Sequence, residues 1–582
     1  MIKKLLASVR EYKLASFLAP AFVVGEVIIE VIVPKLMANL IDFGITQTNM
    51  PYIYQTGAMI VALCLVSLAL GALAGKYAAK AAAGFAKNLR HDMYYSVQKF
   101  SFSNIDKFST SSLVTRMTTD VSNVQNAYMM IVRTAFRSPA MIIFSMVMAF
   151  SINAKVSLVF LAMVPVLAVG FLLIFSKAHP IFKKVFRTYD DLNNIVGENL
   201  HGIRVVKAFV REKHEDEKFK AVSGDLYNLF VKAEKLVIMN MPLMQLVIYA
   251  SMLLMSWISA RYIAASHNDP ALGMTTGQFT SLFTYLMQMM MNLMMLSMIF
   301  MMIVISRSSI ERIAEVLDEQ PDLVNGDSPS KEVKDGSIRF EGVSFSYNGG
   351  DKYCLSDVDL EIKSGETVGI IGGTGSSKST IVQLIPRLYD ATKGKVIVSG
   401  KDVRDYDIET LRNEVAMVLQ KNVLFSGTIK ENLRWGDASA TDEDIVRVCK
   451  LAQADSFIEK FPDKYDTYIE QGGTNVSGGQ KQRLCIARAL LKKPKILILD
   501  DSTSAVDTKT DSLIRKAFAE EIPNTTKIII AQRISSIENA DKIIVMDGGK
   551  INAVGTHDEL LKSNKIYQEV YYSQVKGGSD DE

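Results

Sequence analysis

A glycine-rich run follows a short apolar segment in the second half of the chain. The segment Thr367-Val-Gly-Ile-Ile371 predicts a buried strand, and Gly372-Gly-Thr-Gly-Ser-Ser-Lys378-Ser379-Thr380 then opens into helix-favouring sequence. A strand, a glycine loop and a helix in this order wrap backbone N–H groups around phosphates. We expect Lys378 to contact the β- and γ-phosphates of a nucleotide and the Ser379 hydroxyl to bind Mg²⁺.

The loop departs from the strict phosphate-loop pattern in the residue type at one position. Ser377 replaces the second glycine of the pattern GxxxxGK[ST]. A Cβ atom there could crowd a phosphate or be accommodated, and we expect it to be accommodated. The expected nucleotide contacts of this loop are Gly372, Gly373, Thr374, Gly375, Ser376, Ser377, Lys378, Ser379 and Thr380.

Two acids follow one another at the end of a second apolar segment, Lys495-Ile-Leu-Ile-Leu-Asp500, which is followed by Asp501. Asp500 is expected to bind or support Mg²⁺ together with Ser379. Gln420 follows the apolar segment Val415–Leu419 and could reach both the metal and an attacking water. Tyr347 is a candidate to stack on adenine, although a lone aromatic is as often part of a core.

The composition divides the chain into an apolar half and an ordinary α/β half. At 582 residues, 49% of them hydrophobic, the chain exceeds the usual size of one domain. Four scattered cysteines without a CxxC pair and six dispersed histidines indicate neither a zinc site nor a disulfide framework. Six stretches reach the roughly 20 apolar residues that a membrane span needs: Leu14–Leu40, Thr56–Ala82, Met130–Phe150, Val156–Phe175, Leu236–Ala264 and Thr276–Ile305.

The loops between these stretches differ in length and charge. Those after the first, third and fifth spans are short, and Lys155 is their only Lys or Arg, whereas the other two are long and basic. The positive-inside rule then predicts that both termini and both long loops are cytoplasmic. Met1–Lys13 is basic and amphipathic without a cleavage site, so we expect it to lie along the cytoplasmic membrane face, with a plain solvated leader as the alternative. We expect a multi-pass protein of a bacterial cell membrane.

Helix-favouring sequence continues from the spans into both long loops. Their expected tips, Ser112–Val121 and Glu198–Phe209, could dock on a soluble domain or could be simple hairpin turns. The predicted architecture is a six-span α-helical transmembrane domain fused to an α/β phosphate-loop nucleotide-binding domain. We expect the transmembrane domain at residues 1–317, a linker at 318–336, the nucleotide-binding domain at 337–575 and an acidic tail at 576–582.

The pattern Val476-Ser477-Gly478-Gly479-Gln480 lies between the phosphate loop and Asp500. With the features above, it makes nearly the whole chain resemble the ATP-binding cassette (ABC) exporters, with six spans ahead of one nucleotide-binding domain. The resemblance implies that two such domains close head to tail, so that each ATP lies between one phosphate loop and the other domain's Ser477, Gly478, Gly479 and Gln480. It also implies an adenine platform at Tyr347, a Q-loop at Gln420, a dimer-seam loop at Ser504–Asp507 and coupling helices at the cytoplasmic tips.

Besides Ser377, three further positions depart from the pattern of that family. Asp501 stands where the family has the glutamate that positions the attacking water, Gln532 replaces a histidine after the next strand, and Gln471 replaces a glutamate ahead of the signature. Aspartate is one methylene shorter than glutamate, and a misplacement of about 1 Å can cost about 10²-fold in rate. Asp501 and Gln532 together resemble the degenerate-site subunit of heterodimeric multidrug exporters.

Polar residues inside the predicted spans indicate interior surfaces. Glu26 and Glu30 share one helix face, and they could bind cationic substrates or pair with Lys or Arg of a partner subunit. Met287–Met302 contains nine methionines, which could form a soft wall for apolar ligands or simply fill space. Gln288 and Asn292 share a face that is expected to point toward a cavity or a neighbouring helix.

The sequence thus predicts one subunit of an ATP-driven exporter, with ATP and Mg²⁺ as cofactors. The expected partners are a second, different half-transporter, membrane lipid and a hydrophobic or amphipathic substrate. A lipid or peptide exporter of the same fold and an ATP-gated regulatory membrane subunit remain as alternatives. The six spans exclude a nucleic-acid-handling ATPase.

Overall fold

The computed structural model describes residues 2–266, 268, 273–347, 350, 352–501 and 506–577. The chain divides into two compact units: Met1–Gln98 with Thr110–Glu319, and Lys99–Ser109 with Gln320–Glu582. Two segments differ from the predicted division. The predicted linker belongs almost entirely to the second unit, and so does the short segment Lys99–Ser109. Residues 578–582 of the predicted acidic tail lie outside the described residues.

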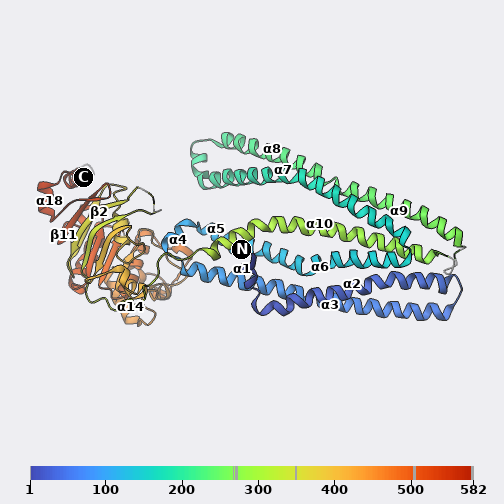
Figure 1. The fold of residues 1–582 in the computed structure, drawn as a ribbon. Coiled ribbons are helices and arrows are strands. Elements are labelled where there is room, and N and C mark those ends of the chain that lie inside the picture. Colours follow the sequence, from blue (N-terminus) through green and yellow to red (C-terminus); the bar gives the residue numbers. More distant parts are fainter. Residues whose placement is uncertain are drawn as a thin grey trace. The chain divides into compact units, whose positions relative to one another are not determined.

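The first unit is a bundle of long helices (Figure 1). Helix α6 packs along α2 and α10, and α7 packs along α8 and α9. Its helices are α1 (Ile2–Ala7), α2 (Lys13–Asn39), α3 (Met50–Lys99), α5 (Thr110–Thr115), α6 (Val121–Ile152), α7 (Ala154–Ala208), α8 (Glu212–Val237), α9 (Asn240–Ser266) and α10 (Thr276–Asp318).

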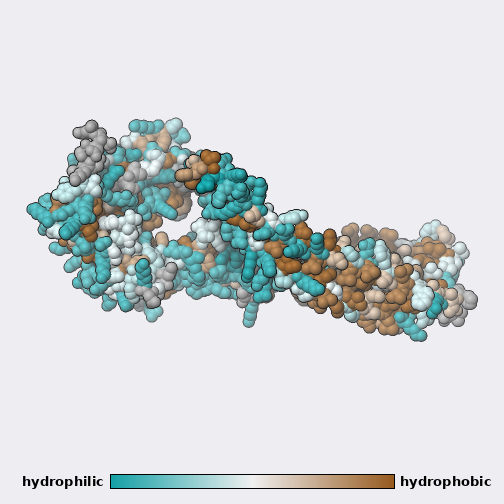
Figure 2. Space-filling view, turned by 90° about the horizontal axis from the view of Figure 1, so that it is seen from above, coloured by the Kyte–Doolittle hydropathy of each residue, from teal (hydrophilic) through white to brown (hydrophobic). Residues whose placement is uncertain are grey.

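Six helical segments among the described residues are long and apolar enough to cross a membrane, and each contains one of the predicted spans or most of it. Large apolar side chains such as Leu68, Leu161 and Leu253 are exposed on this bundle. Figure 2 shows hydrophobic side chains gathered over one stretch of the helical unit. An apolar exterior of this kind is stable against lipid rather than water, and helices suit lipid because they bond most of their backbone polar groups internally.

Local sequence explains where the helices begin. Asn153 accepts hydrogen bonds from the backbone nitrogens of Lys155 and Val156 and so starts α7. Thr275 and Gln278 form a reciprocal capping box at the start of α10. The hydroxyl of Tyr285, further along α10, donates to the carbonyl oxygen of Val31 across 2.7 Å and ties α10 to α2.

Among its described residues, the second unit contains a sheet of four strands in the order β2-β1-β4-β5, one of six in the order β12-β11-β3-β10-β9-β6 and the small pair β7-β8. The strands are β1 (Ile338–Phe345), β2 (Leu355–Ile362), β3 (Thr367–Gly372), β4 (Lys393–Val398), β5 (Lys401–Asp402), β6 (Val415–Val418), β7 (Gly427–Thr428), β8 (Tyr468–Ile469), β9 (Ile496–Asp500), β10 (Thr526–Ile530), β11 (Lys542–Asp547) and β12 (Lys550–Gly555). All five residues of β9 are buried, as expected of a parallel strand covered on both faces.

Helices cover the strands of this unit (Figure 1). Those after the linker are α11 (Lys378–Gln383), α12 (Ile408–Glu414), α13 (Ile429–Leu433), α14 (Asp442–Leu451), α15 (Asp455–Ile458), α16 (Gly478–Leu491), α17 (Thr508–Glu521), α18 (His557–Ser563) and α19 (Lys565–Gly577). The linker packs against this unit through Ser330, whose backbone nitrogen donates to the carbonyl oxygen of Asp405 and whose carbonyl oxygen accepts from the nitrogen of Asp407.

The tip of the first long loop differs from the predicted one. The short helix that packs on the second unit is α4 (Phe102–Lys107), whereas Ser112–Val121 lies in the helical segments that lead back into α6. Asp106 of α4 accepts a hydrogen bond from the hydroxyl of Tyr389 across 2.6 Å, and Phe102 contacts the same ring edge-on. Ser101 caps α4, and this local stop signal explains why the chain turns at that point.

Candidate nucleotide site

Four neighbouring parallel strands position the candidate site. Strands β3, β10, β9 and β6 lie side by side in that order and run in the same direction. The phosphate loop follows β3, Gln532 follows β10, Asp500 and Asp501 stand at the end of β9, and Gln420 follows β6. Because parallel strands end at the same edge of a sheet, residues from four distant segments meet there.

The phosphate loop folds around its own lysine. Nζ of Lys378 donates hydrogen bonds to the carbonyl oxygens of Gly372 and Gly373, across 2.9 and 2.8 Å. A Cβ atom on Gly372 would lie 2.2 Å from the carbonyl oxygen of Met546, so only glycine fits where the loop leaves β3. Burial lowers the pKa of Lys378, and the charges of Asp501 and Asp500 oppose this shift.

Ser377 takes the backbone conformation for which a glycine would be suited. Its φ is 68° and its ψ is 28°, in the left-handed region. A residue with a Cβ atom pays roughly 1–2 kcal/mol to adopt this conformation. The loop therefore retains its turn despite the substitution, and the cost is backbone strain at Ser377.

Asp500 and Ser379 offer oxygen atoms to a divalent cation. Ser379 donates from its hydroxyl to Oδ1 of Asp500 across 2.9 Å, and only 2% of Asp500 is exposed. Burial raises the pKa of Asp500, the neighbouring charge of Asp501 adds to the rise, and the hydrogen bond from Ser379 opposes it. A hydroxyl and a carboxylate are ligands of the type that Mg²⁺ prefers beside nucleotide phosphates.

Asp501 lies between two glutamines. Nε2 of Gln532 donates to Oδ2 of Asp501 across 2.6 Å, and Gln420 also hydrogen-bonds to this carboxylate. Burial raises the pKa of Asp501, while these hydrogen bonds and the charge of Lys378 lower it. The backbone of Asp501 is left-handed, with a φ of 48°. The carboxylate is therefore engaged by side chains from two other strand ends.

Tyr347 lies beside the phosphate-loop helix. Its hydroxyl hydrogen-bonds with Oγ1 of Thr380 across 2.9 Å and donates to Oε1 of Gln383 across 3.3 Å. The ring packs edge-on against Tyr389 and Phe345, and 38% of the residue is exposed. Tyr347 is thus both anchored to the loop and open on one side.

The signature segment begins a helix. Ser477 is the N-cap of α16, its Oγ accepts from the backbone nitrogen of Gln480, and Oε1 of Gln480 accepts from the nitrogen of Ser477. Ser477 and Gly478 are exposed, while Gly479 is half-buried. An exposed helix start with its first N–H groups turned outward favours an anionic ligand.

Asp507, Gln471 and His557 lie on other elements of the second unit. Asp507 caps α17, accepting from the nitrogen of Thr510 across 2.9 Å, whereas Ser504 and Ala505 lie outside the described residues. Gln471 is exposed in a turn before the signature. His557 hydrogen-bonds with the hydroxyl of Tyr567 between the two last helices.

Comparison with known proteins decides the family. The profile described as "ABC transporter transmembrane region" matches residues 16–293, and that described as "ABC transporter" matches residues 355–504. The chain is 36% identical over 573 residues to the uncharacterized ABC transporter ATP-binding protein YfiB of Bacillus subtilis, covering 98% of both chains. The chain belongs to the ABC transporter family.

Two further relatives extend this ABC assignment. The chain is 30% identical over 586 residues to an ATP-dependent lipid A-core flippase of Desulfotalea psychrophila, covering 99% of both chains. The solved structure of a bacterial Atm1-family ABC exporter with ATP bound superposes with a TM-score of 0.82 at 22% identity, covering 97% of this chain and 99% of that chain, which establishes the shared fold. The chain is therefore an ABC exporter half-transporter, a multi-pass membrane protein whose ABC domain is an ATPase.

The transmembrane unit of this ABC exporter contains an ion-pair cluster that the sequence reasoning missed. Arg137 of α6 contacts Oε1 of Glu26 across 2.8 Å and Oε2 of Glu30 across 2.7 Å, both on α2. The two glutamates are thus paired within their own chain. The available signal was Arg137 itself, one of two arginines inside the apolar run Met130–Phe150, since a charge at that depth needs a partner.

The methionine run of α10 in this ABC exporter divides between interior and exterior. Met289 and Met290 are buried in the helical core, whereas Met291, Met295 and Met298 are exposed. Gln288 and Asn292 point toward neighbouring polar groups, because Gln288 donates to the carbonyl oxygen of Glu30 across 3.5 Å and Asn292 donates to that of Gln288 across 2.8 Å.

Proposed function

We propose that this chain is the weakly hydrolysing half of a two-subunit ABC exporter. The observation that carries this proposal is the contact of Gln532 and Gln420 with Asp501. Hydrolysis requires a base that holds water in line with the γ-phosphorus. The shorter side chain of Asp501 is held by two amides instead, and Gln532 supplies no titratable or positive group.

The same loop supports ATP binding with Mg²⁺. Lys378 would exchange its two carbonyl partners for phosphate oxygens, which are stronger, charge-assisted acceptors. Ser379, Asp500 and Gln420 would hold Mg²⁺, which neutralises phosphate charge when bound. Tyr347 would stack on adenine with the open side of its ring. The expected outcome is tight ATP binding with slow turnover.

The intact signature is proposed to work in trans. Ser477, Gly478, Gly479 and Gln480 begin a 14-residue helix with an exposed N-terminal end. In the proposed assembly this end faces the γ-phosphate in the partner's phosphate loop, and the partner supplies the glutamate and the histidine. This chain would therefore complete a productive site although its own is weak.

The proposed cargo is hydrophobic or amphipathic, as in multidrug exporters. A lipid cargo has independent support, because a relative 30% identical over nearly the whole chain is named a lipid A-core flippase. The basic long loops support a cytoplasmic position for both termini, and the bacterial source of the relatives supports a bacterial cell membrane.

The decisive experiment compares the chain alone with the chain co-purified with a second half-transporter. In lipid nanodiscs, a fluorescent ATP analogue with Mg²⁺ measures binding, and phosphate release measures turnover. We expect the chain alone to bind nucleotide without appreciable turnover, and the mixed assembly to hydrolyse ATP. Brisk hydrolysis by the chain alone would overturn the proposal of a weak site.

Pumping is tested separately from ATP-dependent gating. Inverted vesicles that contain both halves should accumulate a labelled amphiphile only with hydrolysable ATP. Vesicles in which Ser477 is replaced by Arg, which should disable the productive site, serve as the control for leakage. Flux that follows the gradient equally well with a non-hydrolysable analogue would favour the regulatory or channel-like alternative.

A further inference from the structure

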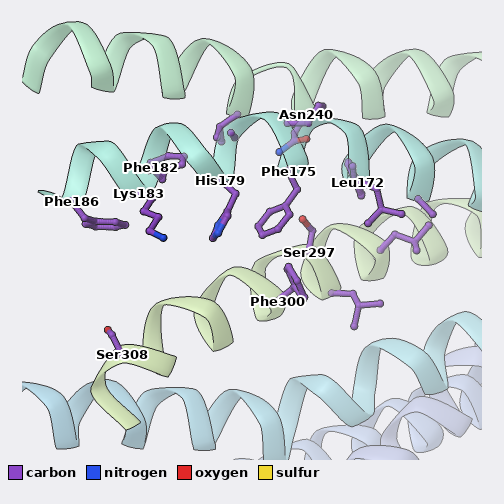
Figure 3. Close-up of a pocket in the computed structure, with 17 residues that line it drawn as sticks. Leu172, Phe175, His179, Phe182, Lys183, Phe186, Asn240, Ser297, Phe300 and Ser308 are labelled. Carbon is purple, nitrogen blue, oxygen red and sulfur yellow. The ribbon is translucent and has the colours of Figure 1, made fainter. Parts of the chain in front are cut away.

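A cavity of about 630 Å³ lies in the helical unit between α7 and α10, and the adjoining ends of α8 and α9 complete its wall (Figure 3). Small-molecule sites typically measure about 300–1,000 Å³. The wall is largely aromatic and aliphatic, and its members include Phe171, Leu172, Phe175, Phe182, Leu296 and Phe300. The methionines of α10 do not contribute to it among the described lining residues.

One end of the cavity is lined by polar and basic side chains. Phe175, His179 and Lys183 follow each other at four-residue spacing on α7, so they share one helix face. Figure 3 shows all three side chains directed toward α10. The apolar run of α7 ends at Phe175, and the histidine and lysine lie beyond it. The cavity therefore passes from an apolar region to a basic one.

The aromatic groups at this transition contact each other. The rings of Phe175 and His179 stack with centroids 5.5 Å apart, and Phe300 of α10 meets Phe175 edge-on at 5.1 Å. These contacts hold His179 at the boundary between the apolar wall and Lys183. Asn240, Ser297 and Ser308 add hydrogen-bonding groups to the lining.

The basic end lacks a counter-charge in the described part of the chain. No aspartate or glutamate is among the described lining residues, and neither His179 nor Lys183 forms an ion pair there. Three other lysines of the same long helices form ion pairs in the described part of the chain: Lys207 with Glu212, Lys218 with Glu198 and Lys220 with Asp216. An unpaired cation at the end of an apolar cavity is complementary to an anion attached to an apolar body.

We propose that this cavity binds the exporter's cargo, and that this cargo is an amphiphile with an anionic headgroup. The headgroup, a phosphate, sulfate or carboxylate, would lie beside Lys183 and His179, and the apolar body along Phe175 and Phe300. This inference rests on the proposed export function and names its substrate class. The alternative anionic sites for cationic cargo, Glu26 and Glu30, are engaged by Arg137.

Binding of matched probes tests the headgroup assignment. Full-length exporter in nanodiscs of phosphatidylcholine alone is titrated, without nucleotide, with dodecyl phosphate and with dodecyltrimethylammonium. We expect the wild type to bind dodecyl phosphate about tenfold or more tightly than the cation, as one charge-assisted contact would produce. Lys183→Glu should remove or reverse this preference. Equal affinities in the wild type would overturn the proposal.

A neighbouring lysine provides the control. Lys184 is exposed and adjacent in sequence but does not line the cavity, so Lys184→Glu should leave the preference for dodecyl phosphate intact. A loss of the preference in both variants would reveal a general surface-charge effect and overturn the assignment. Phe300→Ala should weaken both probes alike, because it removes apolar contact without changing charge.

A second arm separates cargo from a resident lipid. Dodecyl phosphate should stimulate ATP hydrolysis by the two-subunit exporter and be taken up with ATP, whereas binding without either response would identify a structural lipid and overturn the cargo assignment. The nucleotide-free binding titration does not depend on which site hydrolyses ATP. If the proposal of a weak ATP site fails, the binding titration can still be interpreted. If the headgroup assignment fails, the measurements of ATP hydrolysis can still be interpreted.

Discussion

Gln532 donates a hydrogen bond from Nε2 to Oδ2 of Asp501 across 2.6 Å, so the two residues that depart most from the ABC pattern contact each other. Strands β10 and β9 are adjacent and parallel, with Ile530 paired to Asp500, which brings the two positions to one place. Under the proposed function the two residues would act as one unit, because the amide of Gln532 binds the carboxylate that would otherwise be available to water.

Restoring both residues should restore hydrolysis at this site. In the assembled exporter, Ser477→Arg first disables the partner's site, so that the remaining phosphate release reports this chain's own site. Against that background, Asp501→Glu or Gln532→His alone should change turnover little. The double variant should raise turnover, by up to about 10²-fold if water positioning is limiting. A single Asp501→Glu variant that reaches the rate of the double variant would contradict the coupling.

Ser477 should be required for turnover although its own chain's site is weak. Because Ser477 also caps α16, its loss to alanine mixes a structural cost of about 1 kcal/mol with any catalytic effect. Ser477→Asp separates the two, since aspartate caps helices well but would repel a γ-phosphate. We expect thermal stability near that of the wild type and at least about a tenfold loss of phosphate release. Full activity of Ser477→Asp would exclude a role in trans.

Ser377→Gly should stabilise the nucleotide-binding unit. Glycine adopts a φ of 68° without the Cβ clash, so the gain expected is about 1 kcal/mol. Thermal unfolding of the full chain, monitored with nucleotide absent, measures the shift. Ser377→Ala retains the Cβ atom and serves as the matched control, with no comparable gain expected. A lower melting temperature for Ser377→Gly would show that the serine side chain contributes more than its strain costs.

Arg137→Met should destabilise the helical unit because it leaves Glu26 and Glu30 without their cation. Breaking a fully buried ion pair typically costs about 3–5 kcal/mol. Because the side chains of Arg137 and Glu30 are 29% exposed and that of Glu26 is 14% exposed, we expect a smaller loss here. The triple variant Glu26→Gln, Glu30→Gln and Arg137→Met should recover most of that loss. Melting temperatures in detergent give the comparison. A second measurement compares the stimulation of ATP hydrolysis by cationic compounds in the wild type and in the double variant Glu26→Gln/Glu30→Gln. Stimulation that is lost in the double variant would show that the cluster binds cargo, and that its role is more than structural.

Asp106→Ala should weaken the attachment of α4 to the nucleotide-binding unit. Its carboxylate accepts from the hydroxyl of Tyr389 across 2.6 Å, and hydrogen bonds to charged groups contribute about 1.5–3 kcal/mol. We expect reduced stimulation of ATP hydrolysis by transported compounds, with nucleotide affinity retained. Asp106→Asn keeps an acceptor and should give a smaller effect. Equal loss in both variants would indicate that charge, not the hydrogen bond, matters.

The elements that sequence reasoning predicted well are those specified by short-range patterns. Six apolar runs matched six helical segments in the described part of the chain, because about 20 consecutive apolar residues can satisfy their backbone in lipid most readily as a helix. The strand before Gly372 and the strand ending at Asp500 were likewise predicted from local hydrophobicity. The docking helix was misplaced to Ser112–Val121, because helix-favouring sequence does not reveal which turn packs on a distant surface.

The sequence by itself determined which side chains are available for chemistry: a lysine and serines after a glycine loop, consecutive aspartates at a strand end, and a helix-capping signature. Only the tertiary structure decided their partners. Glu26 and Glu30 meet Arg137, Gln532 meets Asp501, and Lys183 lies at an apolar cavity. The physical reason is that propensity and periodicity act over a few residues, whereas these contacts depend on which helices and strands pack together.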